Sequence, residues 1–247
     1  MIPLKSVEDL KKLKASGEIL GRVMGSLKKS IAVGISTAEI DRIAEELIIK
    51  EGAKPAFKGY RGFPATLCAS VNEEIVHGIP GERKLREGDI VGIDLGVKYL
   101  GYFSDAAVTF AVGKVKPEIN KLVEVSRQAL TEAIKVSIVG NNLSDISYRI
   151  QSFVEGKGFS VVRQFVGHGI GLELHEEPEI PNFGSPHRGP VLKSGMVLAI
   201  EPMVNMGSWE SEILPNGWTA VTKDRLPSAH FEHTVAITED GPQILTN

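Results

Sequence analysis

The chain has 247 residues and carries 28 lysines and arginines against 31 aspartates and glutamates, a formal net charge of −3. Hydrophobic residues make up 42 % and charged residues 24 %, close to the average of globular domains, which excludes a disordered chain and a coiled coil. The slightly acidic balance argues against a dedicated nucleic-acid surface, and the lack of a run of eighteen apolar residues argues against a membrane span.

The N-terminal segment of the chain shows helical periodicity. Ser6 is placed to cap a helix whose first turn is acidic and whose apolar stripe continues through Leu27. A second helix is predicted from near Thr37, ending at Gly52. Short apolar runs broken by glycines then predict strands from about residue 68 to residue 112.

The second part of the chain follows the same order. Helical periodicity returns at Pro117 and continues through Ile134, and a further helix is predicted from Ser144 to about Val154. After Val161 the pattern favours strands and loops. Because no proline-rich or low-complexity linker interrupts the chain, we expect residues 1–247 to form a single domain.

Three segments of the first half match segments of the second half in the same order. The matched pairs are Val33-Gly34 with Val139-Gly140, Gly88–Asp94 with Gly195–Glu201, and Asp105–Val108 with Glu232–Val235. They predict an internal repeat of about residues 30–113 and 136–241. The seam between two such halves is a common place for a binding site.

Four carboxylates stand at matched places in this repeat. Asp94 and Glu201 each end an apolar run, and Asp105 and Glu232 each begin the next predicted strand. A hairpin predicted around residues 98–101 brings the first two acids together, and the repeat predicts the same for the second pair. A buried carboxylate costs several kcal/mol unless it is compensated, so four of them together require an explanation.

Divalent metal ions are the favoured compensation. A basic cluster and proton sharing are the alternatives, but only Lys98 and Arg225 lie nearby in the sequence. Two ions about 3.5–4 Å apart share bridging carboxylates when an imidazole completes the site. The candidate imidazoles are His77, His168, which stands in a glycine-rich run, and His175; the contexts of His187, His230 and His233 favour no ligand role.

The four acids and His168 occur in an order that resembles the dinuclear-metal methionine aminopeptidases: Asp94, Asp105, His168, Glu201 and Glu232. The size of the chain resembles the type I, bacterial-style enzymes. The stretches that carry this resemblance are Ser70–Pro80, Gly167–Gly171, His175–Pro178, Ala199–Met203 and Phe231–Val235. The resemblance covers essentially the whole chain. It implies an α+β pita-bread fold, in which a pseudo-two-fold antiparallel β-sheet is covered by helices.

The resemblance also implies a metal site. Asp94 would bind one divalent ion, His168 and Glu201 the other, and Asp105 and Glu232 would bridge the two. This donor set admits cobalt, manganese, iron or zinc and does not choose among them. By the same resemblance, a loop with Asn72, Glu74 and Ser228 would hold a monovalent cation through carbonyl groups.

Catalytic and substrate-binding roles are implied in the same way. Glu201 would transfer a proton, and His77 and His175 would contact the scissile peptide. Tyr60, Phe63, Cys68 and Trp218 fall at the positions of a hydrophobic methionine pocket, which His77 and His175 adjoin. The sequence departs from the commonest family pattern at Arg61, Phe63 and Leu174.

The function expected from the sequence is therefore a metalloaminopeptidase that removes the initiator methionine from nascent polypeptides with a small second residue. An X-Pro-type aminopeptidase or prolidase of the same fold and a metal-free peptide-binding relative are the alternatives. Prolidase relatives usually carry an additional N-terminal domain, and metal-free relatives lose the ligands that this chain keeps. We expect a monomer that acts on nascent chains, at the ribosome or after release. The lone cysteine, Cys68, and the charged N-terminal segment favour the cytoplasm.

Overall fold

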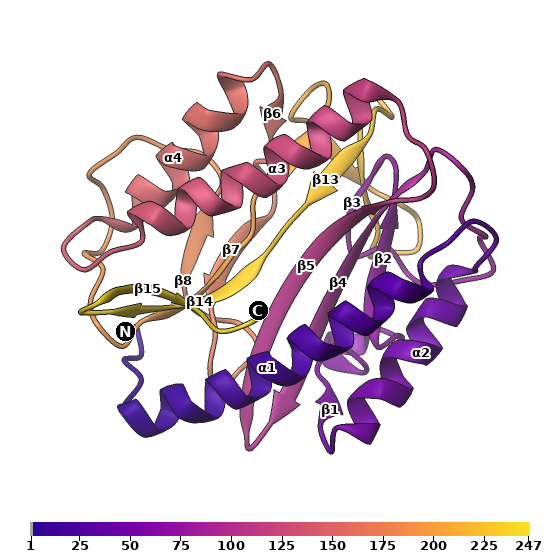
Figure 1. The fold of residues 1–247 in the computed structure, drawn as a ribbon. Helices are drawn as coiled ribbons and strands as arrows, with labels where there is room; N and C mark the ends of the chain where they lie inside the picture. Colours follow the sequence, from indigo (N-terminus) through magenta and orange to yellow (C-terminus); the bar gives the residue numbers. More distant parts are fainter. Residues whose placement is uncertain (1) are drawn as a thin grey trace.

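The computed structural model describes residues 2–247, and helices and antiparallel strands alternate along them in two blocks (Figure 1). The helices are α1 (Val7–Ser30), α2 (Thr37–Lys50), α3 (Pro117–Val136) and α4 (Leu143–Glu155), with a 3₁₀ turn at Tyr60–Gly62. The strands of the first block are β1 (Lys54–Pro55), β2 (Leu67–Val71), β3 (Glu74–Val76), β4 (Ile90–Tyr99) and β5 (Tyr102–Ala111). Those of the second block are β6 (Ser160–Val161), β7 (Val166–Gly169), β8 (Glu176–Pro181), β9 (Val197–Ile200), β10 (Met203–Asn205), β11 (Ser211–Ile213), β12 (Ala220–Thr222), β13 (Ser228–His230), β14 (His233–Thr238) and β15 (Gly241–Ile244).

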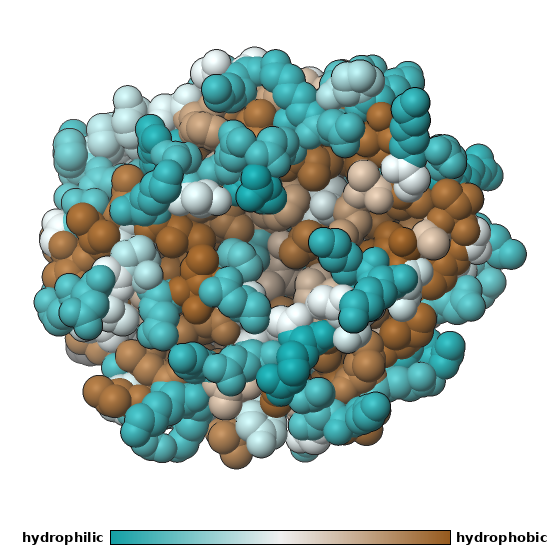
Figure 2. Space-filling model, viewed as in Figure 1, coloured by the Kyte–Doolittle hydropathy of each residue, from teal (hydrophilic) through white to brown (hydrophobic). Residues whose placement is uncertain are grey.

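The four predicted helices are confirmed, and their starts follow from local capping. Ser6 caps α1 by accepting a hydrogen bond from the Asp9 backbone N–H at 3.2 Å. Ser36 caps α2, and Pro117 occupies the first turn of α3, where its missing N–H costs nothing. Among the described residues no helix is both long and apolar enough to cross a membrane. Figure 2 shows hydrophilic residues spread over the visible face of the molecule, with apolar residues between them.

Two antiparallel sheets meet at the middle of the molecule. In the first sheet, β4 pairs with β5 along one edge and with β2 and β1 along the other. In the second, β9 lies between β14 and β7, which pair onward with β15 and β8. Strands β5 and β14 run side by side in the centre of Figure 1, where the Glu232 backbone N–H donates to the Ala107 carbonyl at 2.9 Å. The seam between the two blocks therefore passes beside Glu232.

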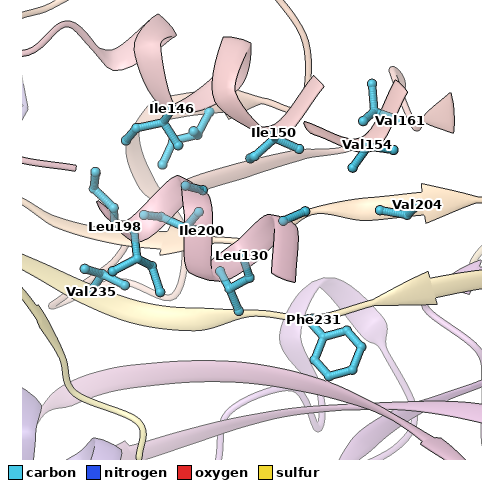
Figure 3. Close-up of a cluster of buried hydrophobic side chains, with 14 of the residues drawn as sticks. Leu130, Ile146, Ile150, Val154, Val161, Leu198, Ile200, Val204, Phe231 and Val235 are labelled. Atoms are coloured by element: carbon cyan, nitrogen blue, oxygen red, sulfur yellow. The ribbon is translucent and has the colours of Figure 1, made fainter. Parts of the chain in front are cut away.

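Each sheet is covered by its own pair of helices. Helices α1 and α2 pack on the first sheet, and α3 and α4 pack on the second (Figure 1). Figure 3 shows the second core, where Leu130 and Ile146 lie over Leu198, Ile200 and Val235. The predicted internal repeat of about residues 30–113 and 136–241 within a single catalytic domain stays a prediction.

Candidate active site and metal centre

The first sheet presents two of the four carboxylates on one face. Asp94 lies opposite Ala107 in the β4–β5 ladder and Asp105 lies opposite Gly96, so the two acids are diagonal neighbours. The sequence placed them at strand ends, which is wrong, because β4 and β5 are ten residues long and the acids lie inside them. The chain turns only at residues 100–101, within the predicted hairpin.

The second sheet brings the other two carboxylates to the same place. Glu201 directly follows β9 and Glu232 directly precedes β14, and these strands pair with His233 opposite Ile200. The backbone bonds between Glu232 and Ala107 carry this end of β14 against β5. Asp105 and Glu232 are buried, with exposed fractions of 4 % and 2 %.

The converging acids leave buried oxygens that no protein group satisfies. Among the described residues, Asp94 Oδ1, Asp105 Oδ1 and Glu232 Oε1 are buried and have no hydrogen-bond partner. The basic residues near them in sequence do not help, since Lys98 lies over the Phe103 ring and Arg225 pairs with Glu212. Unpaired buried carboxylates are strongly destabilising, and divalent cations are the compensation that this donor set fits.

Two overlapping groups of ligand atoms lie within this cluster. Within each group the ligand atoms lie within 4.8 Å of one another; the groups are Asp105, His168 and Glu232, and Glu201, His230 and Glu232. His168 Nδ1 lies 2.8 Å from the Gly169 carbonyl, and its Nε2 lies 3.7 Å from Glu201 Oε1. Asp94 belongs to neither group, although its pKa responds to both Asp105 and Glu201.

His230 is the residue that the sequence analysis missed. Its Nε2 atom is buried, lies 3.5 Å from Glu201 Oε2 and has no hydrogen-bond partner among residues 2–247. The available signal was its spacing, since residues two apart in an extended segment face the same side and His230 stands two before Glu232.

Burial changes the protonation of the cluster. Desolvation raises the pKa of Asp94 to about 6, and it raises that of Glu201 to about 7. Desolvation and then the neighbouring carboxylates raise the pKa of Asp105 and Glu232 well above their ordinary values. Without a counterion the cluster therefore retains protons near neutral pH, and bound cations would replace those protons.

All eleven residues predicted for the site line one pocket with a cavity volume of about 270 Å³. They are Tyr60, Phe63, Cys68, His77, Asp94, Asp105, His168, His175, Glu201, Trp218 and Glu232. Phe165, Arg61 and Leu174 also line this pocket, and sequence reasoning gave no role to Phe165. Phe63 and Trp218 meet edge to face with ring centroids 5.2 Å apart, which forms an aromatic wall beside the acids.

Two further histidines face the same cavity. His175 Nδ1 lies 2.9 Å from the Tyr60 hydroxyl, and its ring lies 4.2 Å from that of His168, measured between centroids. Burial and the neighbouring His168 lower the pKa of His175 to about 3. Burial and His230 likewise lower the pKa of His77 to about 4. Both imidazoles are therefore neutral at pH 7.

The residues of the predicted monovalent-cation loop also lie together. The Ser228 backbone N–H donates to the Asn72 carbonyl at 2.9 Å, and the Glu74 carboxylate accepts from the Val71 N–H. The cation itself stays a prediction.

The glycines around His168 are required by close backbone contacts. A Cβ at Gly169 would lie 2.1 Å from the Glu177 carbonyl oxygen of β8. We expect Gly169→Ala to lower the free energy of unfolding by about 1–3 kcal/mol, because β7 must move away from β8 and carry His168 with it. Urea unfolding measures this change.

Gly25→Ala is the matched control, because no described atom lies within 4 Å of the added methyl group on α1. It should stabilise the protein by about 0.5–1 kcal/mol. A Gly169→Ala protein as stable as the wild type would contradict the close approach of β7 and β8.

Comparisons with known proteins agree with this geometry. The model of metallopeptidase family M24 matches residues 11–239. Methionine aminopeptidase of Clostridium perfringens is 54 % identical over 100 % of this chain and 99 % of its own. The crystal structure of methionine aminopeptidase from Thermotoga maritima superposes with a TM-score of 0.98 at 46 % identity, covering 100 % of both chains. Prolidase from Pyrococcus furiosus superposes with a TM-score of 0.81 at 26 % identity, but only 65 % of that chain is covered.

Proposed function

Because the chain belongs to metallopeptidase family M24, as one of its methionine aminopeptidases, we propose that its buried acids hold two divalent ions beside a methionine pocket. The enzyme removes the initiator methionine from polypeptide N-termini. The finer proposal is that it acts on chains whose second residue is small. The observation that carries the metal assignment is the convergence of four carboxylates in one pocket, three of which have a buried oxygen without a hydrogen-bond partner among the described residues.

The chain offers a ligand set for each ion. Asp94 would hold one ion, His168 and Glu201 the other, and Asp105 and Glu232 would stand between them. Such ions supply Lewis acidity and lower the pKa of water. The mixture of carboxylate and imidazole donors suits manganese, iron, cobalt or zinc.

Side chains of the pocket are suited to transfer the proton and to bind the scissile peptide. Glu201 is placed to accept a proton from the attacking water and to return it to the leaving amine, because its carboxylate lines the pocket between His168 and His230. His77 and His175 are neutral and line the same cavity, so they are suited to hydrogen-bond the scissile peptide. The Tyr60 hydroxyl holds His175 by its Nδ1 atom and leaves Nε2 for substrate.

The apolar part of the pocket suits a methionine side chain. Tyr60, Phe63 and Trp218 supply aromatic surface, and a thioether packs favourably on aromatic rings. Burial and the charge of Asp94 raise the pKa of the Cys68 thiol well above its ordinary value, so Cys68 lines this pocket as a neutral group. Leu174 is smaller than the phenylalanine frequent in the family and leaves more room at this wall.

The nature of the substrate indicates the compartment in which the enzyme works. We infer that the enzyme works as a monomer in the cytoplasm, where nascent chains expose their amino termini, at the ribosome or after release. The single cysteine is consistent with a reducing compartment.

One experiment tests the proposed function against its alternatives. The purified protein is analysed for bound metal and is assayed with Met-Ala-Ser and with X-Pro peptides. We expect divalent metal to be bound and only the methionine peptide to be cleaved. Cleavage of the X-Pro peptide alone would support the prolidase alternative, and a protein that binds no divalent ion would support the metal-free one.

His175→Ala tests the role of the neutral imidazoles. We expect kcat/KM for Met-Ala-Ser to fall about 10²–10³-fold, because one preorganised donor to the developing oxyanion is lost. Steady-state kinetics on the metal-loaded enzyme measures the loss. The control is His187→Ala, whose side chain is 83 % exposed and should leave kcat/KM unchanged. Wild-type activity in His175→Ala would remove this residue from the mechanism.

A further inference from the structure

The backbone holds His230 in a fixed place beside the acids. The His230 N–H donates to Thr109 Oγ1 at 2.9 Å, and that hydroxyl donates to the His230 carbonyl at 2.8 Å. Strand β13 is also paired with β10, where His230 lies opposite Met203. The side chain is 4 % exposed, so its direction is set by packing on all sides.

The imidazole of His230 points into the carboxylate cluster. Its Nε2 lies 3.5 Å from Glu201 Oε2, while His168 Nε2 lies 3.7 Å from the other oxygen, Oε1. Glu201 is therefore flanked by two imidazoles, one for each carboxylate oxygen. His230 Nε2 is one of the buried atoms of residues 2–247 that have no hydrogen-bond partner, and His168 Nε2 is not among them.

The two candidate ligand groups have the same composition. Each contains one imidazole and two carboxylates, and both include Glu232. Two atoms that bind one ion at about 2.1 Å lie at most about 4.2 Å apart, so the separation of His230 Nε2 from Glu201 Oε2 fits a shared ion. The same separation is too long for a hydrogen bond, whose heavy atoms normally lie about 2.7–3.2 Å apart.

We propose that His230 is an additional metal ligand, so that each of two ions in the cluster receives one imidazole nitrogen, from His168 or from His230, while Glu201 offers one carboxylate oxygen to each side. The inference rests on the two-metal function proposed above. A second nitrogen donor favours borderline ions such as cobalt and zinc over manganese at the His230 position. It also satisfies the buried Nε2 atom that the protein leaves without a partner.

The test counts the histidines that bind metal. Metal-free protein carrying ¹³C,¹⁵N-labelled histidine is titrated with Co²⁺, and calorimetry follows the stoichiometry. NMR follows the contact shifts of the ring nitrogens, which pass through a metal–nitrogen bond and so distinguish ligands from the neighbouring His77 and His175. In the wild type we expect two equivalents to bind and two histidines to show shifted resonances. His230→Gln should show one, with the affinity for one of the two equivalents reduced by at least about 10–100-fold. His187→Gln, at an exposed histidine, should behave as the wild type.

The outcomes separate this inference from the proposed function. Two bound equivalents with a single shifted histidine in the wild type would overturn the role of His230 and leave the two-metal function standing. Unchanged cobalt affinity in His230→Gln would do the same. A wild-type protein that binds no cobalt would overturn both. If His230→Gln does not fold, His175→Gln and His77→Gln take its place. Both should keep two shifted histidines, and the loss of one in either variant would assign the second imidazole elsewhere and overturn the role of His230.

Discussion

Glu201→Gln is expected to lower kcat/KM for Met-Ala-Ser by at least about 10³-fold, because the glutamine can neither take nor return a proton. The variant also loses a charged metal ligand. Replacing one carboxylate oxygen with an amide nitrogen therefore removes both proton transfer and charge stabilisation from the transition state. The carboxylate stands between His168 and His230, each within 3.7 Å of one of its oxygens. No other carboxylate among the described residues lies within 4 Å of two histidine nitrogens.

The fold of this variant should be unaffected. Burial raises the pKa of Glu201 to about 7 when no metal is bound, so about half of the wild-type groups are already protonated at pH 7. An uncharged amide of the same size therefore removes a desolvation penalty instead of adding one. Circular dichroism and thermal unfolding of the metal-free proteins check this point.

Glu239→Gln is the control for charge, because Glu239 is exposed on the turn between β14 and β15. Its activity should equal that of the wild type. Retained turnover in Glu201→Gln would refute the proton-transfer role, whatever the control shows.

Metal removal is expected to destabilise the protein, and more so as the pH rises. Glu201 titrates near 4.5 when unfolded and at about 7 in the folded, metal-free protein. Between these values the folded state binds more protons, so the free energy of unfolding falls as pH rises, by about 3 kcal/mol for this group alone. Burial and mutual repulsion raise the pKa of Asp105 and Glu232 in the same direction, which extends the fall to higher pH.

The histidines act in the opposite sense at lower pH. Burial lowers the pKa of His77 and His233 to about 4, so folding excludes protons that the unfolded chain binds below pH 6.5. Stability from these groups is present above pH 6.5 and is lost as the pH falls toward 4. Above pH 7 they are neutral in both states, and the carboxylates alone set the slope.

Thermal unfolding with a chelator and with added Mn²⁺, from pH 6 to pH 8.5, measures the effect. We expect the Tm of the chelated protein to fall and the gap between the two Tm curves to widen with pH. The double variant Asp94→Asn, Glu201→Gln should show a shallower slope in the chelator. A gap that stays constant would contradict a cluster held by bound cations.

Local chemistry explains why the helices were predictable. Ser6, Ser36 and Pro117 mark the starts of α1, α2 and α3 through hydrogen bonds and backbone angles that involve only near neighbours in the sequence. The convergence of the carboxylates was predictable for a different reason, since the repeated order of acids implied equivalent strands facing one another. The metal-ligand roles themselves stay predictions until ions are observed.

The strand ends were not predictable in the same way. Nearly all of β4 is buried, with both faces covered, so its sequence shows no alternation that would mark where it stops. Asp94 looked like the end of an apolar run, yet Leu95 and Val97 continue the strand beyond it. An acid inside a buried strand is a violation of the hydrophobic pattern that is expected at a functional site.

His230 was missed because its environment is entirely nonlocal. The neighbours that define it are Thr109 on β5, Met203 on β10 and Glu201 after β9. In the sequence these residues are separated from His230 by long stretches of chain, and nothing beside His230 distinguishes it from a core histidine. Only the packing of both sheets shows that its free nitrogen faces the acids.

The central claim is that acids from both sheets share a pair of divalent ions. Anomalous diffraction from a crystal grown with Mn²⁺ measures this directly. We expect two anomalous peaks about 3.5–4 Å apart, bracketed by Asp105 and Glu232. Peaks found only at the protein surface, with the four carboxylates turned away from any common centre, would contradict it.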